Sequence, residues 1–147
     1  KAKRNYSNFN KTPATKTFQA IRILVNQELT ELILGLIAAT KFLAHGGKLI
    51  VISFHSLEDK IVKYFFRSYL NLKKNPSRYL PINTDNSSLF KLISKKPLTP
   101  NKQEIYNNVR SRSAKLRYAV RNNDLFFYPA EFKRKFENYF KIEEIKL

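Results

Sequence analysis

One stretch of the sequence, from Gly46 to Lys60, constrains the fold of this chain more than any other. Two glycines precede the apolar run from Leu49 to Phe54, and polar residues then begin a helical pattern. A run with little alternation predicts a strand covered on both faces, in the interior of an α/β sheet. In open α/β sheets, ligands bind beyond the carboxyl ends of the strands. Residues 53–56 are therefore the first place to look for chemistry.

The apolar spacing elsewhere predicts helices before and after this strand. Steps of three and four residues indicate one amphipathic helix over 17–43. Ser56 and Asp59 would form a capping box at the start of a second helix, which continues to Leu70. The remaining elements are expected to be a strand over 90–93, a short helix over 101–106, a strand over 114–121 with one apolar and one basic face, and a tail helix after Pro129. This order matches the second half of a doubly wound sheet.

The charge and composition limit the classes of partner. A formal net charge of +17 favours a polyanion, and nucleic acid is a commoner partner of basic chains than a membrane surface. Lysine-rich codon usage would explain part of this excess. The lack of cysteine excludes disulfides and thiolate catalysis, and the longest apolar run, 32–39, is far shorter than the roughly 20 residues of a membrane span. Glycine occurs only at 35, 46 and 47, so the sequence has no G-x-G-x-x-G loop or P-loop.

Polar side chains at the end of the predicted strand form the first candidate site. A hydrolase triad is not expected there, because Ser53 and His55 share one strand face, and Ser56 and Asp59 are explained by the cap. His55 either bonds neighbouring backbone or orients a bound amine and accepts its proton, and both interpretations stay open. Metal binding is not expected, because His45 and His55 are the only histidines and no clustered carboxylates are evident.

Basic residues spaced through 110–117 form the second candidate site. Arginine binds phosphate through a bidentate fork, which lysine lacks. The alternative is a solvated strand edge that is kept basic to prevent aggregation. The overall charge favours RNA contact, and the candidate RNA-binding residues are Arg110, Arg112, Lys115 and Arg117.

Two weaker features also fit a nucleic-acid partner. A polar loop over 73–88 is expected to form a second basic surface. Three tyrosines either stack on bases or pack against the domain, namely Tyr64, Tyr69 and Tyr79.

Four strings, in order along the chain, carry a resemblance to a known family. They are Pro13 to Ile23, Val25 to Leu29, Gly46 to Lys63, and Lys96 to Pro100 followed by Asn108 to Arg117. Together these strings resemble the bacterial small-subunit ribosomal RNA (cytosine-N4) methyltransferases of the MraW type. The resemblance spans most of residues 13–121 and leaves the tail after Asp124 uncovered.

The resemblance implies the C-terminal half of a class I, Rossmann-like methyltransferase sheet that uses S-adenosylmethionine, with an extra C-terminal helix. Residues 1–12 would be a linker or the end of a preceding segment, 13–124 the half domain, and 125–147 the helical tail. The family's cofactor loop would lie upstream, so no cofactor ligand is assigned within this sequence. His55 and Ser53 are the candidates for lining a pocket that holds the target cytosine.

Two functions remain as alternatives. In the first, the chain is a fragment of an enzyme that methylates the exocyclic amine of a cytosine in small-subunit ribosomal RNA, and the fragment alone is inactive. Its partner would be that RNA or the small ribosomal subunit, in the cytoplasm or an organelle matrix, with neither a membrane nor a metal involved. In the second, the chain is a non-catalytic basic RNA-binding module.

Overall fold

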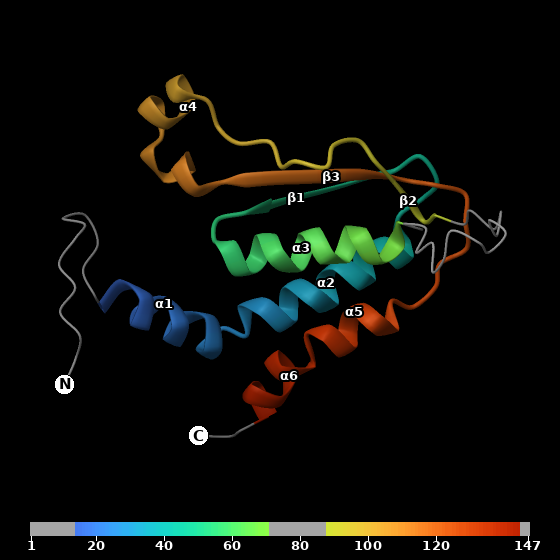
Figure 1. The fold of residues 1–147 in the computed structure, drawn as a ribbon, viewed down its shortest axis with the longest axis horizontal. Coiled ribbons are helices and arrows are strands. Elements are labelled where there is room, and N and C mark those ends of the chain that lie inside the picture. Colours follow the sequence, from blue (N-terminus) through green and yellow to red (C-terminus); the bar gives the residue numbers. More distant parts are fainter. Residues whose placement is uncertain (1–13, 71–87, 145–147) are drawn as a thin grey trace, which may run out of the picture.

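The computed structural model describes residues 14–70 and 88–144. A small sheet lies over a layer of helices, and a separate helical lobe stands above one end of the sheet (Figure 1). The sheet consists of β1 (Lys48–Ser53), β2 (Phe90–Leu92) and β3 (Lys115–Arg121). The expected loop over 73–88 lies almost wholly outside the described residues, as does Tyr79.

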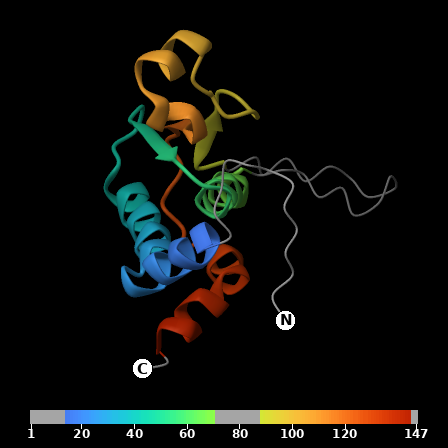
Figure 2. The same cartoon turned by 90° about the vertical axis from the view of Figure 1, so that its left-hand side faces the viewer.

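The strand order in the sheet is β1-β3-β2, and β3 is antiparallel to both neighbours. The register pairs Lys48 with Val120 at one end of β1 and Ser53 with Lys115 at the other. Because both outer strands oppose β3, β1 and β2 run in the same direction. The helix α3 (Ser56–Tyr69) lies between them in sequence and packs against the sheet (Figures 1 and 2).

The prediction of an interior strand, covered on both faces, is wrong for the part of the chain that the structure describes. β1 is an edge strand, and its outward-facing side chains are exposed by 55–56%: Ile50, Ile52 and Phe54, the last just beyond the strand. Leu49 and Val51 point the other way and pack against the core. The apolar run therefore predicted the strand itself, but it did not show that one of its two faces is exposed on the described sheet.

The prediction of one helix over 17–43 is also wrong. The structure has α1 (Ala14–Val25) and α2 (Glu28–Phe42), with a bend of 51° between them. Gln27 adopts a left-handed backbone with φ 52°, and its carbonyl accepts hydrogen bonds from the Thr30 hydroxyl and the Glu31 amide. These bonds start a new helix although the apolar spacing continues across the break.

No single helix among the described residues is long and apolar enough to cross a membrane, and α1 and α2 satisfy length and composition only as a bent pair.

The core lies between the sheet, α2, α3 and the C-terminal segment. Side chains of α3 supply much of it, and Phe65 contacts the rings of Phe66, Tyr69, Phe90 and Phe132. Tyr69 is buried, and burial raises the pKa of its hydroxyl. It therefore packs in the core instead of offering a face to a base.

Two of the later elements match their expected positions closely. The strand expected over 90–93 is β2, and the helix expected over 101–106 is α4 (Lys102–Asn107). A 3₁₀ turn, η1 (Val109–Ser113), follows α4, and the two pack together as the lobe above the sheet (Figure 1).

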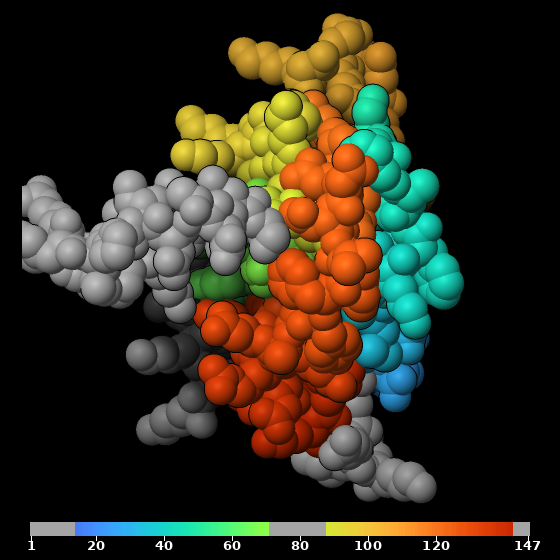
Figure 3. All heavy atoms as spheres, turned by 90° about the vertical axis from the view of Figure 1, so that its right-hand side faces the viewer, coloured from blue at the N-terminus to red at the C-terminus, as the bar shows by residue number. Residues whose placement is uncertain are grey.

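The predicted tail helix is instead two short helices, α5 (Ala130–Lys135) and α6 (Glu137–Glu144). Figure 3 shows this segment continuing down one side of the molecule from β3. Phe132 and Phe136 are buried in the core, which ties the segment to α3. The break falls at Phe136, whose backbone departs from helical geometry.

Candidate functional site at the carboxyl end of β1

A cavity of about 520 Å³ opens where β1 ends and the α4–η1 lobe begins. Its wall combines apolar side chains of β1 with polar side chains of the lobe, and the lining residues are Ile52, Phe54, Glu104, Asn108, Arg110, Ser111 and Ala114. The cavity lies beyond the carboxyl end of β1, where the rule for α/β sheets predicts a ligand site, and that role stays a prediction.

Capping residues hold the lobe in shape. The Asn101 side chain accepts a hydrogen bond from the Glu104 amide at 2.8 Å and starts α4. The Asn108 side chain accepts from the Arg110 amide at 3.1 Å, and its carbonyl accepts from the Ser111 hydroxyl at 2.8 Å. These bonds fix a tight turn in which Ser111 is buried. Arg110 and Arg112 are left exposed on either side of it.

The cavity offers a hydrophobic platform beside charged groups of both signs. Phe54 and Ile52 present apolar surface, and Glu104 supplies a carboxylate that accepts hydrogen bonds. Within residues 14–70 and 88–144, the ion pairs include neither Glu104 nor Arg110. This combination suits a planar, polar ring attached to an anionic backbone.

His55 caps α3, whereas the sequence pattern predicts Ser56 at that position. The His55 Nδ1 atom accepts from the Glu58 amide at 3.4 Å, and a Glu58 carboxylate oxygen accepts from the amides of Phe54 and His55 at 2.8 and 3.3 Å. The capping box is therefore His55 with Glu58, and the prediction of Ser56 with Asp59 is wrong. The helix begins one residue earlier, and Asp59 is engaged elsewhere.

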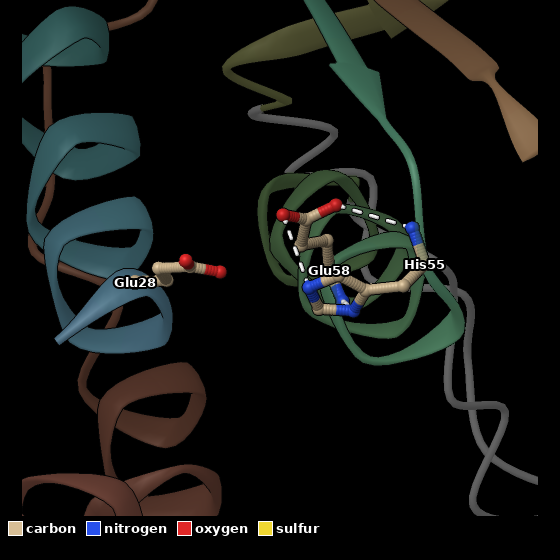
Figure 4. A group of neighbouring side chains, drawn as sticks. All are labelled: Glu28, His55 and Glu58. Carbon is tan, nitrogen blue, oxygen red and sulfur yellow. Dashed lines mark hydrogen bonds and ion pairs between the residues drawn. The ribbon is translucent and has the colours of Figure 1, made fainter. Parts of the chain in front are cut away.

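Glu28 and Glu58 converge on His55, as Figure 4 shows. One possible ligand atom from each residue lies within 4.8 Å of the other two, so the expectation that no carboxylates cluster near a histidine is wrong. Because Nδ1 accepts a backbone hydrogen bond, the proton of the neutral ring belongs on Nε2. That atom lies 3.1 Å from a Glu58 oxygen, without hydrogen-bond geometry. An Nε2 atom that carries a proton has no lone pair for a metal ion, so this arrangement favours the helix cap over a metal ligand.

Glu28 belongs to this cluster through its position at the start of α2. Partial burial alone would raise the pKa of its carboxyl, but hydrogen bonds from Arg22 and Asn26 and the Arg22 charge outweigh burial and lower it. Arg22 Nε lies 2.8 Å from Glu28. The carboxylate thus connects the α1–α2 bend to the cluster at His55.

Ser53 is buried at the end of β1, and its hydroxyl donates to the Lys115 carbonyl at 3.4 Å. Neither Ser53 nor His55 lines the 520 Å³ cavity. Successive strand residues point to opposite faces, so Ser53 lies toward the core while Ile52 and Phe54 face the cavity. The predicted role of Ser53 and His55 in a base pocket stays a prediction.

Arg117 and Lys115, two of the candidate RNA-binding residues, are paired with Asp59. Arg117 Nε lies 2.8 Å from Asp59 Oδ1, and Lys115 Nζ lies 3.3 Å from Oδ2. Burial would raise the pKa of Asp59, but the Arg117 hydrogen bonds and charge, followed by those of Lys115, outweigh burial and lower it. The alternative of a solvated strand edge is wrong, because β3 is the central strand and its basic face packs toward α3.

The structure therefore separates the four candidate RNA-binding residues into two groups. Arg110 and Arg112 are exposed and point from a rigid turn, as phosphate contacts require. Arg117 has a side chain only 10% exposed. It acts as the buried partner of Asp59, and Lys115 lies at the margin of the same pair.

Of the cavity lining, the sequence singled out the segment that includes Arg110, Ser111 and Ala114, and it did not predict a site role for Ile52, Phe54, Glu104 or Asn108. Ile52 and Phe54 were expected in a buried strand, Glu104 in a short helix, and Asn108 at the start of the last matched string. The signal that could have found Glu104 and Asn108 is their spacing of four residues, since i and i+4 lie on one helix face. Nothing in the local pattern shows that this face meets β1.

Comparison with known proteins gives a consistent result. The sequence model described as the MraW methylase family matches residues 1–122. The protein named ribosomal RNA small subunit methyltransferase H from Xanthobacter autotrophicus is 50% identical over 113 residues, which are 76% of this chain and 32% of the relative. The protein of the same name from Ruegeria sp. is 47% identical over 76% of this chain and 34% of its own length. The one from Ehrlichia chaffeensis is 55% identical over 71% of this chain and 32% of its own length. The chain thus spans about a third of these relatives.

Proposed function

The chain belongs to the MraW methylase family, and on that premise we propose that it forms the RNA-facing part of a methyltransferase acting on small-subunit ribosomal RNA. The proposed reaction moves a methyl group from S-adenosylmethionine to the exocyclic amine of a cytosine. Identity of about half to relatives named for ribosomal RNA methylation is the observation that carries the proposal.

The sheet supports the proposal that this chain is part of a larger Rossmann-like sheet. β1 and β2 run in the same direction with α3 between them in sequence, as in a βαβ unit. The free edge of β1 and its exposed face at Ile50 and Ile52 would accept a further strand and a covering helix. Together with the coverage of a third of the relatives, this edge supports the C-terminal-half assignment.

The described residues do not fit the methyl donor. Gly46 and Gly47 precede β1, at the opposite end of the strand from the cavity, and Gly35 lies within α2. Nucleotide cofactors in such sheets are held beyond the carboxyl ends of strands by a tight glycine turn. We therefore assign no donor ligand in this chain, and the proposal places the donor on residues outside its described part.

The cavity at the end of β1 is the proposed site for the target base. The lone pair of the cytosine amine is delocalised into the ring, so a site must hold the amine hydrogens while the lone pair turns toward the methyl group. Glu104 provides an acceptor for those hydrogens, and Phe54 provides a surface for the unstacked ring. Arg110 would bind the adjacent phosphate through its guanidinium fork.

The test is methyl transfer by the protein that contains this chain, measured as N4-methylcytosine in small-subunit ribosomal RNA by mass spectrometry of nucleosides. Glu104→Gln and Phe54→Ala are expected to lower the rate at least tenfold, or about 1.4 kcal/mol of barrier, with folding unchanged. Unchanged rates in both variants would refute the base site.

Matched variants test the sequence-based assignment of the pocket. His55→Asn keeps a capping side chain at the start of α3, and Ser53→Ala removes only the buried hydroxyl. If these two residues line the base pocket, both changes lower the methylation rate; if their roles are structural, both rates stay near wild type.

The alternative function, a non-catalytic RNA-binding module, is favoured by the lack of a donor site in the described residues together with the exposed Arg110 and Arg112. It predicts RNA binding without methyl transfer. The same assay separates the two functions. A ribosomal RNA substrate would place either one in the cytoplasm or an organelle matrix.

A further inference from the structure

Cations from two helices distant in sequence surround one tyrosine, Tyr64 on α3. Lys135 from α5 places its Nζ atom 4.1 Å from the centre of the Tyr64 ring. The guanidinium carbon of Arg67, one turn along α3, lies 5.8 Å from the same centre. The ring also contacts Phe136, edge to face at 6.0 Å. The tertiary structure thus builds a mixed aromatic and cationic surface that neither helix forms alone.

Within residues 14–70 and 88–144, no carboxylate forms an ion pair with the cations of this surface. The Lys135 ammonium beside the Tyr64 ring, followed by the charges of Arg67 and Lys60, lowers the pKa of the phenol. In the portion of the chain with described coordinates, the ion pairs include none of Lys60, Arg67 and Lys135. Neighbouring unpaired cations repel one another, so the arrangement favours an anionic partner.

The surface is held rigidly by the core. Phe132 and Phe136 are buried on either side of Lys135 in the sequence, and Phe132 contacts Phe65 of α3 at 5.3 Å. The position of Lys135 is therefore fixed when the chain folds. Residues 123–147, which include α5, lie beyond the region matched by the family model, so this half of the surface is additional to the family pattern.

The surface chemistry fits RNA better than a lipid bilayer. Helices that lie in a membrane interface insert exposed apolar side chains beside their cations. Among the described residues of α3 and α5, Leu57 is the one large hydrophobic side chain exposed to solvent, and its exposed fraction is 39%, so the surface offers little apolar area for insertion. Cations that follow a phosphate backbone, with an aromatic ring between them, are typical of single-stranded nucleic-acid binding.

We propose a second RNA-binding surface, separate from the cavity at the end of β1, that contacts another part of the ribosomal RNA. This α3–α5 surface consists of Lys60, Tyr64, Arg67 and Lys135. The inference rests on the proposed function only for the identity of the RNA, because binding by this surface does not require methyl transfer.

The test compares two triple variants of the full chain that remove equal charge. Lys60→Gln with Arg67→Gln and Lys135→Gln removes the cations of the α3–α5 surface. The control removes three exposed lysines elsewhere through Lys16→Gln, Lys41→Gln and Lys91→Gln. Binding to a fluorescently labelled small-subunit rRNA hairpin is measured across a salt series, and circular dichroism verifies that both variants fold.

The surface variant is expected to lose at least about tenfold in affinity at low salt. The slope of log affinity against log salt should flatten by about two, because each phosphate contact contributes roughly 0.7–0.9. The control should change the slope by less than one. Equal losses in the two variants would reduce the effect to net charge and overturn the proposal, as would no loss in the surface variant.

Vesicles of phosphatidylserine and phosphatidylcholine provide the second arm. If the surface variant loses vesicle binding but retains RNA binding, the surface is a lipid site and the proposal is overturned. If RNA binding depends on the surface while methyl transfer is absent, the proposed enzyme function fails and the α3–α5 surface stands. If methyl transfer occurs but RNA binding does not depend on the surface, the enzyme function stands and the α3–α5 surface fails.

Discussion

The pair between Asp59 and Arg117 gives the sharpest test of how this fold is held together. It joins the first turn of α3 to the central strand β3 across 58 residues of sequence. Both side chains are largely buried, with exposed fractions of 14% for Asp59 and 10% for Arg117. The guanidinium also donates to the Lys95 carbonyl at 3.3 Å. Replacing Asp59 by Asn keeps the side-chain size but leaves a buried cation without its counter-charge.

The expected cost of Asp59→Asn is about 2–3 kcal/mol of unfolding free energy. Breaking a fully buried pair from one side costs about 3–5 kcal/mol, and the residual exposure and the Lys95 carbonyl reduce that penalty. Lys115 contacts the same carboxylate, but its side chain is 39% exposed. Lys115→Gln is therefore the matched control, with an expected cost of less than about 1 kcal/mol.

Urea denaturation of a double-mutant cycle measures the interaction. Arg117→Met keeps an unbranched stem without a charge, so the double variant with Asp59→Asn contains no unpaired buried ion. The coupling energy is expected to be about 2 kcal/mol. A coupling below about 0.5 kcal/mol, or a loss in Lys115→Gln as large as in Asp59→Asn, would refute the assignment of Arg117 to a structural pair and would return it to the RNA-binding candidates.

Three further outcomes follow from the structure. The pKa of Asp59 is lowered in the folded state, so its contribution to stability is present above the ordinary value of 3.8 and is lost as the pH falls through the lower folded value. At pH values below about 4, the urea midpoint of Asp59→Asn should therefore fall less steeply with pH than the midpoint of wild type. Glu58→Ala removes the acceptor of two backbone amides and should lower the unfolding free energy, measured by urea denaturation, by about 1 kcal/mol. Glu58→Gln keeps an acceptor oxygen and should retain most of that stability. Equal losses of stability in the two variants would contradict the capping box. Phe132→Ala should lower the unfolding free energy by about 3–4 kcal/mol, because the Phe132 ring is buried among other aromatic rings. Phe127→Ala is the control, because Phe127 is 43% exposed. A similar loss of stability in both variants would show that α5 is not anchored through Phe132.

The sequence predicted the elements best where the pattern is local. The start of α3 near residue 56, the short strand at β2 and the short helix α4 were all found within one or two residues, because strand and helix periods depend on neighbouring side chains. The break at Gln27 was missed, since the apolar spacing continues across it while one left-handed residue redirects the chain.

The sequence pointed to the carboxyl end of β1, where the structure has a cavity, and the role of this region as a functional site stays a prediction. The cavity is lined by Phe54 and Glu104 and not by Ser53 or His55. Which side chains face a cavity depends on the direction of the pleat and on the element packed across it. Neither is encoded in the spacing of residues 53–56.

By itself, the sequence determined the family, the basic character of the chain and the approximate positions of β1, α3, β2, α4 and β3, because motifs, charge and periodicity are properties of the linear chain. Only the tertiary structure decided that Arg117 pairs with Asp59 while Arg110 stays exposed, and that Lys135 lies over Tyr64. Identical residue types take opposite roles because burial and counter-charge come from segments tens of residues away, and long-range packing alone brings those segments into contact.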